Sequence, residues 1–355
     1  MGSEMCIRDR KSTVAVVAMA LSTTLLAQPH QFPAPTTVSE TMAAAVAAPV
    51  ADLWIKAPKS VSDWQAIASE YAETVGQSAL NQAKALDVDV QTTQIASVNV
   101  NVLTPKSIDQ GKADKIIFYI HGGGYVLGDG ISGIVEALPM ASDHHYKVFC
   151  VDYRMAPEFP FPAAIDDAFA VYQELVKSYG ADNIAVMGTS TGGAMALILA
   201  LQAHAAKVNM PAALISGTPW SDMDKIGDSY FVNDGVDNVL GTYDGLIKTA
   251  VDYYAQGHDL KDPLLSPVYA SDDALQAFPP TLLISGTRDL FLSNTVRMHT
   301  RLLLNKAPAE LIVYEALSHA QYYFVANAPE TENHYRLLGC LLYTSPSPRD
   351  GLLSR

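Results

Sequence analysis

The sequence predicts an α/β domain in which helices cover both faces of a mostly parallel central sheet and a helical cap covers one of its edges. Short apolar runs alternate with helical segments along the chain, as they do in α/β domains. The runs are almost continuously apolar, which is typical of strands buried on both faces. Two segments, 36–87 and 218–262, interrupt the alternation with helical sequence and are the predicted cap elements.

The first predicted strand covers residues 96–103 and places Val98, Val100 and Val102 on one face. Six further strands are apolar runs bounded by turn residues, at 115–120, 147–153, 183–188, 212–217, 281–286 and 310–315. In the cap, Ser62–Gln65 has the sequence of a capping box that opens a helix.

Composition narrows the class of protein. The chain has 355 residues, 49% of them hydrophobic, which is enough for one large domain or two small ones. Its formal net charge of −14 argues against nucleic acid or an anionic membrane surface as a partner. Beyond residue 30 there is no run of 18 apolar residues, so no membrane span is expected. The expected partner is a small molecule.

The two ends of the chain are unlike folded sequence. One short DNA element can encode both tails: it reads as residues 4–10 in one direction and as residues 340–345 on its complementary strand. This resembles a sequencing adapter left on a metagenomic fragment. We therefore expect residues 1–10 and 340–355 to be adapter-encoded, which leaves residues 28–339 as the folded domain.

Residues 11–27 are apolar with a basic start and precede a Pro-rich stretch, which is typical of a truncated signal peptide. A periplasmic or secreted location is the corresponding expectation. Cys6 and Cys340 fall in the two tails, so Cys150 is left alone and no disulfide is expected. Cys150 lies in an apolar run and is interpreted as a core residue.

The stretch Gly-Thr-Ser-Thr-Gly-Gly at 188–193 can be interpreted in two ways, as a flexible turn or as a nucleophile elbow. A buried strand precedes it and a helix follows it directly, and this strand–turn–helix setting is the one that a nucleophile elbow requires. We therefore expect Ser190 to be a nucleophile on a strained bend. Glycine is expected to be needed at positions 188 and 192, because side chains there would collide with the neighbouring strand and helix.

The sequence His-Gly-Gly-Gly at 121–124 follows another predicted strand. Glycines let the backbone approach a ligand closely and point its amides inward. The N–H groups of Gly123 and Gly124, with that of Thr191, are the expected oxyanion hole of an acyl-transfer enzyme. His121 is expected to orient this loop and not to act as the base.

An acid and a base are expected after the serine, in that order. Asp289 and His319 both follow predicted strands, at the edge where open α/β sheets build their sites. Asp289 would orient the His319 imidazole, and His319 would take the proton of Ser190. The other acids considered, Asp262, Asp272 and Asp273, lie in polar loops, and His144 and His145 precede a strand at the opposite edge.

These motifs make the chain similar to the hormone-sensitive lipase family of α/β-hydrolases, the family IV bacterial carboxylesterases. The matching stretches are 121–129, 152–168, 188–196, 262–270, 278–293 and 315–323. The resemblance implies an α/β-hydrolase fold with a helical cap, no metal and no cofactor, and hydrolysis of esters with short or medium acyl chains. A homodimer is a further expectation, because dimers are common in this family.

The chain departs from the family pattern in several places. Thr189 stands where many relatives have Asp, which places the chain with the Thr-containing (GTSAG-type) subgroup, and Thr191 stands where they have Ala. The side chain of Thr191 is expected to narrow the acyl pocket. Leu290 replaces a frequent Pro, and Ser293–Asn294 replaces an acidic pair, so the support of His319 is an open question.

Four aromatic residues are candidates for the substrate pocket, namely Tyr125, Trp220, Tyr230 and Phe231. A buried ion pair of Arg154 with Asp166 or Asp167 is expected to brace the site loops. The leading hypothesis is a serine carboxylesterase that forms a covalent acyl-enzyme. The alternatives are a lactone hydrolase, an amidase or a deacetylase with the same residues, and a non-catalytic binding protein of the same fold.

Overall fold

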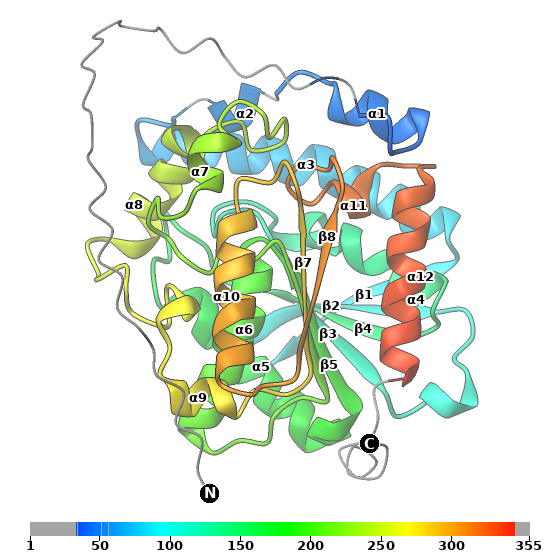
Figure 1. Cartoon of the computed structure of the whole chain (residues 1–355). Helices are drawn as coiled ribbons and strands as arrows, with labels where there is room; N and C mark the ends of the chain where they lie inside the picture. Colours follow the sequence, from blue (N-terminus) through cyan, green and yellow to red (C-terminus); the bar gives the residue numbers. More distant parts are fainter. Residues whose placement is uncertain (1–32, 34, 51, 56, 345–355) are drawn as a thin grey trace, which may run out of the picture. The chain divides into compact units, whose positions relative to one another are not determined.

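The computed structural model describes residue 33 and residues 35–50, 52–55 and 57–344 of the chain. They form an eight-stranded sheet in the order β1-β2-β4-β3-β5-β6-β7-β8 (Figure 1). The strands are β1 (Val88–Ile95), β2 (Val98–Pro105), β3 (Ile116–Ile120), β4 (Lys147–Asp152), β5 (Ile184–Thr189), β6 (Ala213–Gly217), β7 (Thr281–Gly286) and β8 (Ala309–Tyr314). β3 to β8 run parallel, while β1 and β2 pair antiparallel at one edge, so the mostly parallel sheet is confirmed.

The seven predicted strands all form, within about two residues of their expected bounds. The eighth, β1, was not predicted. Most of its residues are exposed, and it is held by its pairing with β2. An edge strand of this kind lacks the continuous apolar run by which the buried strands were recognised.

Helices cover both faces of the sheet because successive strand residues point to opposite sides. In β3, Phe118 and Ile120 belong to one core cluster, which also contains residues of α5 (Ala163–Tyr179), α6 (Thr191–Ala206) and α10 (Leu292–Leu304). Ile117 and Tyr119 belong to a second cluster on the other face, with residues of α4 (Leu138–Ser142) and α12 (Pro329–Thr344). Figure 1 shows α10 and α12 on opposite sides of β7 and β8.

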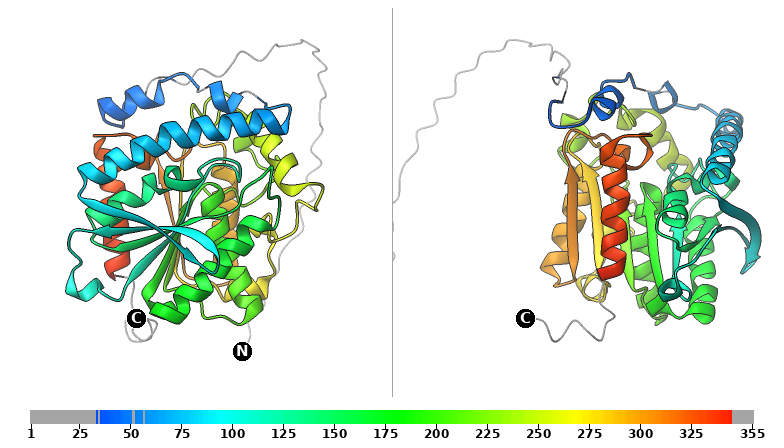
Figure 2. Two further views of the ribbon diagram at one scale, coloured as in Figure 1. Left: turned by 180° about the vertical axis from the view of Figure 1, so that it is seen from behind. Right: turned by 90° about the vertical axis from the view of Figure 1, so that its right-hand side faces the viewer.

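The predicted cap segments contain the helices that lie over the carboxyl ends of the strands (Figures 1 and 2). These are α1 (Glu40–Val46), α2 (Asp52–Ile55), α3 (Val61–Ala85), α7 (Ser229–Val232), the short η4 (Tyr243–Ile247) and α8 (Lys248–Ala255). The capping box of α3 was placed wrongly. Ser60 is the N-cap, and its hydroxyl accepts from the N–H of Asp63, whose carboxylate accepts from the N–H of Ser60. Gln65 instead donates to Glu158.

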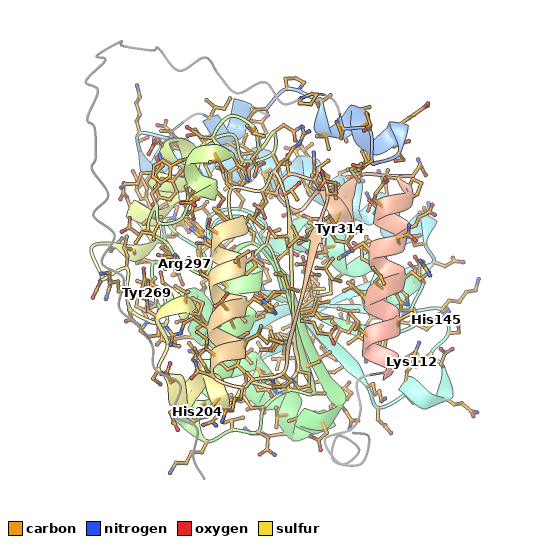
Figure 3. The ribbon with its side chains drawn as sticks, in the orientation of Figure 1. Lys112, His145, His204, Tyr269, Arg297 and Tyr314 are labelled. Atoms are coloured by element: carbon orange, nitrogen blue, oxygen red, sulfur yellow. The ribbon has the colours of Figure 1, made fainter. Side chains whose placement is uncertain are left out.

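The second cap segment is fastened to α10 by a buried carboxylate. Asp222 is fully buried and accepts from Arg297 Nη1 at 2.7 Å and from the hydroxyl of Tyr269 at 2.8 Å. Arg297 and Tyr269 are both labelled in Figure 3. Because breaking such a buried pair leaves a charge without its partner, this contact fixes where the cap chain leaves the sheet.

The structure tests the predicted limits of the folded domain only in part. Residues 1–27 and 345–355 lie outside the described residues, so the signal-peptide expectation and most of the adapter expectation stay predictions. Helix α12 continues through residues 340–344, and Leu341 and Leu342 pack against the second core cluster. Among the described helices, none has the length and apolar character needed to cross a membrane.

Candidate active site

The turn between β5 and α6 holds Ser190 in a conformation that few residues adopt. Its φ is 62° and its ψ is −121°. The backbone is fixed on both sides: the N–H of Ser190 donates to Gly217 O at 2.8 Å, and its C=O accepts from the N–H of Trp220 at 3.1 Å. Strained backbone held this firmly is typical of functional sites.

The flanking glycines are required by close backbone contacts. A Cβ at Gly188 would lie 2.4 Å from Gly192 O, and a Cβ at Gly192 would lie 2.0 Å from Ile120 O. Neither contact is tolerable, so larger residues would push the turn away from the sheet. The geometry agrees with the collision argument made from the sequence.

The structure brings Asp289 and His319 together at the carboxyl ends of β7 and β8. His319 Nδ1 lies 2.9 Å from Asp289 Oδ1, and both side chains are buried. Asp289 is itself held, because Oδ1 accepts from the N–H of Phe291 at 2.8 Å and Oδ2 accepts from the hydroxyl of Ser285 at 2.7 Å. These contacts orient the imidazole plane.

The other ring nitrogen of His319 faces the site. His319 Nε2 lies 3.4 Å from Thr218 Oγ1, and His319 and Ser190 line the same cavity. Among the described residues, the Ser190 hydroxyl has no hydrogen bond to His319. A small rotation of either side chain is therefore needed for proton transfer, as is common before substrate binds. The rejected acids Asp272 and Asp273 pair elsewhere, with Arg301 and His204.

The loop of residues 121–124, which we call the glycine loop, lies against the turn that carries Ser190. Gly123 and Gly124 have φ values of +115° and +68°, and a Cβ built on Gly122 would lie 3.1 Å from Ser190 Cβ. Among the described residues, the N–H groups of Gly123, Gly124 and Thr191 donate no hydrogen bond. Free N–H groups beside a nucleophile can receive a developing negative charge.

His121 lies under the glycine loop. Its Nδ1 donates to Gly122 O at 2.7 Å, its ring stacks on Tyr153 at 4.1 Å, and the hydroxyl of Tyr153 donates to its C=O at 2.9 Å. Burial lowers the pKa of His121 to about 4, so the ring is neutral at ordinary pH. These contacts agree with a role in shaping the loop.

The cavity above Ser190 and His319 has a volume of about 280 Å³. Its lining includes residues of the glycine loop and aromatic residues of the cap and of α11 (Gln321–Phe324). The aromatic residues include Trp54, Tyr71, Tyr323 and Phe324.

Comparison with known proteins places this geometry in a family. Residues 117–323 match the sequence profile described as the alpha/beta hydrolase fold. An esterase of Acinetobacter venetianus is 32% identical over 212 residues, which cover 59% of this chain and 69% of that protein. The chain belongs to the hormone-sensitive-lipase-like family of α/β-hydrolase esterases. It is a carboxylic ester hydrolase.

Other relatives agree. An acetyl-hydrolase of Streptomyces hygroscopicus is 26% identical over 250 residues, which cover 70% of this chain and 82% of that protein. The crystal structure of an esterase is similar with a TM-score of 0.83 at 40% identity, over 89% of this chain and 97% of that one. A crystal structure described as an esterase from the bacterial hormone-sensitive lipase family is similar with a TM-score of 0.67 at 28% identity, over 72% of this chain and 84% of that one.

The present chain has a second, much smaller cavity of about 10 Å³ that Ser190 also lines. Its lining is almost entirely apolar and comes from the glycine loop, the cap and the loop after β7. The lining residues are Trp54, Gly124, Ser190, Trp220, Leu240, Leu246, Ile247, Ala250 and Phe291. We call this cavity the apolar slot.

Of the four predicted pocket aromatics, only Trp220 lines one of the two cavities at Ser190. Phe231 is 64% exposed, so its assignment to the pocket was wrong; α7 turns this side chain toward solvent. Tyr125 is buried in a stack on Tyr254 with 3.8 Å between ring centres. Tyr230 is buried against Tyr243 and Phe291. Neither tyrosine lines the cavities at Ser190.

The side chain of Thr191 is also buried and lines neither cavity, so the structure does not support its expected narrowing of the acyl pocket. Thr191 is the first residue of α6, and most residues of this helix are buried. The Arg154 ion pair forms and uses Asp167, although only the carboxylate is buried and the Arg154 side chain is 50% exposed. Nη2 lies 2.8 Å from Oδ1, and the N–H of Arg154 donates to Oδ2 at 3.0 Å.

Glu136 is a site residue that the sequence reasoning missed. It is buried in the wall of the larger cavity, where the hydroxyls of Tyr119 and Thr189 both donate to its carboxylate. Burial raises the pKa of Glu136 to about 7. The threonine that marks the subgroup therefore has a structural partner. The only available signal was one acid within the apolar run at 131–139.

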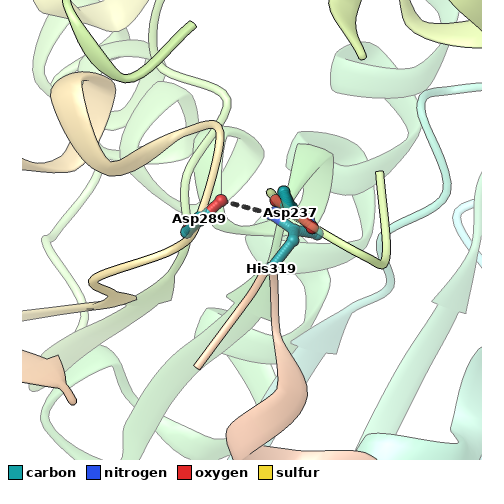
Figure 4. Close-up of side chains that lie close together, drawn as sticks. All are labelled: Asp237, Asp289 and His319. Atoms are coloured by element: carbon teal, nitrogen blue, oxygen red, sulfur yellow. Dashed lines mark hydrogen bonds and ion pairs between the residues drawn. The ribbon is translucent and has the colours of Figure 1, made fainter. Parts of the chain in front are cut away.

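One group of side chains resembles a metal site. Asp237, Asp289 and His319 bring their ligand atoms within 4.8 Å of one another (Figure 4). Their atoms are engaged in hydrogen bonds, because His319 donates to Asp289 while both oxygens of Asp237 accept from backbone N–H groups. This donor set is better suited to orienting the imidazole than to binding a cation.

Proposed function

We propose that the protein is a serine carboxylesterase in which Ser190, His319 and Asp289 form the catalytic triad. The observation that carries the proposal is the convergence of three features at one sheet edge. These are a strained serine, a buried His–Asp pair with one ring nitrogen facing the serine's cavity, and three backbone N–H groups that donate no hydrogen bond among the described residues. This set provides a nucleophile, a base and an oxyanion hole.

The proposed reaction has two halves. In the first, Ser190 Oγ attacks the ester carbonyl carbon while His319 Nε2 takes its proton, and the N–H groups of Gly123, Gly124 and Thr191 hold the oxyanion. The carbon–oxygen bond to the alcohol then breaks, and His319 gives that proton to the leaving alkoxide. In the second half, water attacks the acyl-enzyme, His319 takes its proton and returns it to Ser190, and the carboxylic acid leaves.

The two cavities favour small acyl groups. The apolar slot, at about 10 Å³, holds about one water-sized group, whereas the larger cavity that Ser190 also lines measures about 280 Å³. We assign the acyl chain to the slot and the alcohol to the larger cavity. An acetyl group is the best fit, and one of the relatives is described as an acetyl-hydrolase.

A substrate panel tests this function. We expect p-nitrophenyl acetate to give the highest kcat/KM, with a marked fall from butyrate to longer chains, and lactones and anilides to be turned over much more slowly. Preferred hydrolysis of lactones or anilides would favour a lactone hydrolase or an amidase. Absence of turnover above background with every ester would contradict the proposal and favour a binding protein.

The acyl assignment makes a separate prediction at Trp220. Trp220→Leu opens the apolar slot, and we expect the kcat/KM ratio of hexanoate to acetate esters to rise about tenfold or more, since even one extra methylene accommodated is worth about 1–3 kcal/mol. Phe231→Leu is the matched control, because Phe231 is an exposed aromatic residue of the same cap. An unchanged ratio in Trp220→Leu would assign the acyl chain to the larger cavity.

A further inference from the structure

The cap loop 233–241 contacts both of the loops that carry the His–Asp pair. Asp289 lies on the loop after β7, and His319 lies on the loop after β8. Residues of the cap loop form hydrogen bonds to each of them, and also to α1 of the other cap segment. The cap is therefore joined to the chemical site as well as covering it.

On the acid side, two side chains hold the backbone around Asp289. Asn233 Nδ2 donates to Thr287 O at 3.2 Å and to Asp289 O at 2.9 Å. The N–H of Leu290 donates to Asp237 Oδ2 at 2.9 Å. A proline at position 290 has no N–H, so this last contact depends on the departure from the family pattern noted in the sequence.

On the base side, Asn238 makes the equivalent contacts. The hydroxyl of Ser318, the residue before His319, donates to Asn238 Oδ1 at 2.8 Å, and Gln321 Nε2 donates to the same oxygen at 2.9 Å. Asn238 Nδ2 donates to the C=O groups of Ala45 and Ala48 at the end of α1. The amide of Asn238 thus connects the base loop with the N-terminal part of the cap.

Asp237 lies between these two sets of contacts and is fully buried. Its Oδ1 accepts from the N–H groups of Val239 and Leu240, at 2.9 and 3.0 Å. The titratable groups that face it are Asp289 and His319, within 4.8 Å (Figure 4). Burial, and then the charge of Asp289, raise the pKa of Asp237 to about 6, while the three N–H donors and His319 favour its ionised form.

We propose that Asp237 is a positioning residue for the triad: its carboxylate fixes the loop of Asp289 through Leu290 and adds a second negative charge beside the His319 imidazole. This inference rests on the proposed function. The charge acts when His319 carries the proton of Ser190, because a buried anion close to the ring stabilises the imidazolium. Asp237 contacts neither substrate nor the reacting atoms.

The test compares Asp237→Asn with Asp234→Asn. Asp234 is an exposed acid of the same loop, so the control removes an equal charge without touching the triad. In Asp237→Asn we expect kcat for p-nitrophenyl acetate to fall about tenfold or more with KM nearly unchanged. Loss of a charge that favours the imidazolium should also move the acid limb of the pH–rate profile to lower pH, by about one unit. Asp234→Asn should match the wild type in both.

Two outcomes would overturn the inference. One is a wild-type kcat and acid limb in Asp237→Asn; the other is a fall in kcat with an unmoved acid limb, which would leave Asp237 a purely structural residue. If Asp237→Asn does not fold, Leu290→Pro takes its place, because it removes the N–H that donates to Asp237 Oδ2 and keeps the buried charge. A lower kcat with an unmoved acid limb in Leu290→Pro would support the positioning role, and a wild-type kcat would contradict it. Failure of the wild type to hydrolyse any ester would instead refute the proposed function.

Discussion

Ser190→Ala is expected to lower kcat for short-chain esters by about 10⁶-fold, to the low rate that the oxyanion N–H groups and substrate binding alone support. The substitution removes one oxygen from a turn that is fixed by backbone contacts at Gly217 and Trp220. The bend itself should therefore persist. KM for the residual reaction should stay close to that of the wild type, because the cavity walls are unchanged.

Covalent labelling separates this prediction from a general loss of structure. A fluorophosphonate probe followed by intact-mass measurement should add one label to the wild type and none to Ser190→Ala. Ser132→Ala is the matched control: Ser132 lines the same cavity, but its hydroxyl donates to Asp129 O. That variant should label fully. A label on Ser190→Ala would mean that a different residue is the nucleophile.

The strands and the triad candidates could be predicted because their signals are local in the sequence. Each buried strand is a short apolar run, and the turn around Ser190 is recognised by Gly188 and Gly192, which flank it between a strand and a helix. The sites of Asp289 and His319 follow from chain order and from the rule that parallel strands place their carboxyl ends at one edge. These arguments need no knowledge of how distant segments pack.

The site residues that sequence reasoning missed are brought into place by packing between segments that lie far apart in the chain. Glu136 becomes a partner of Thr189 only because the short helical segment after the glycine loop is folded over the sheet edge, 53 residues earlier in the chain. Asp237 meets Leu290 from a cap loop 53 residues away. The assignment of Phe231 to the pocket was wrong for the same reason. Its neighbour Tyr230 turns inward, and the four-residue helix α7 is too short for the sequence pattern to show which of the two is buried.

The second large effect is expected at Asp289, and the structure predicts that two substitutions there differ. Asp289→Ala removes the hydrogen bond to His319 Nδ1 and the negative charge together, so kcat should fall about 10⁴-fold. In Asp289→Asn the outcome depends on which amide atom faces the ring. The N–H of Phe291 donates to Asp289 Oδ1, the same oxygen that receives the His319 contact.

A fixed backbone donor at that position selects the carbonyl oxygen of the asparagine, because the amide NH₂ would meet the Phe291 N–H as a second donor. The NH₂ group then faces the hydroxyl of Ser285, which can rotate and accept. The imidazole tautomer is kept and only the charge is lost, so we expect Asp289→Asn to lose about 10²-fold in kcat, well short of Asp289→Ala. Measured kcat values for the two variants, with thermal melts as the control for folding, check this order. Equal losses would show that the asparagine amide turns its NH₂ toward His319 and that the Phe291 N–H does not set the orientation of this side chain.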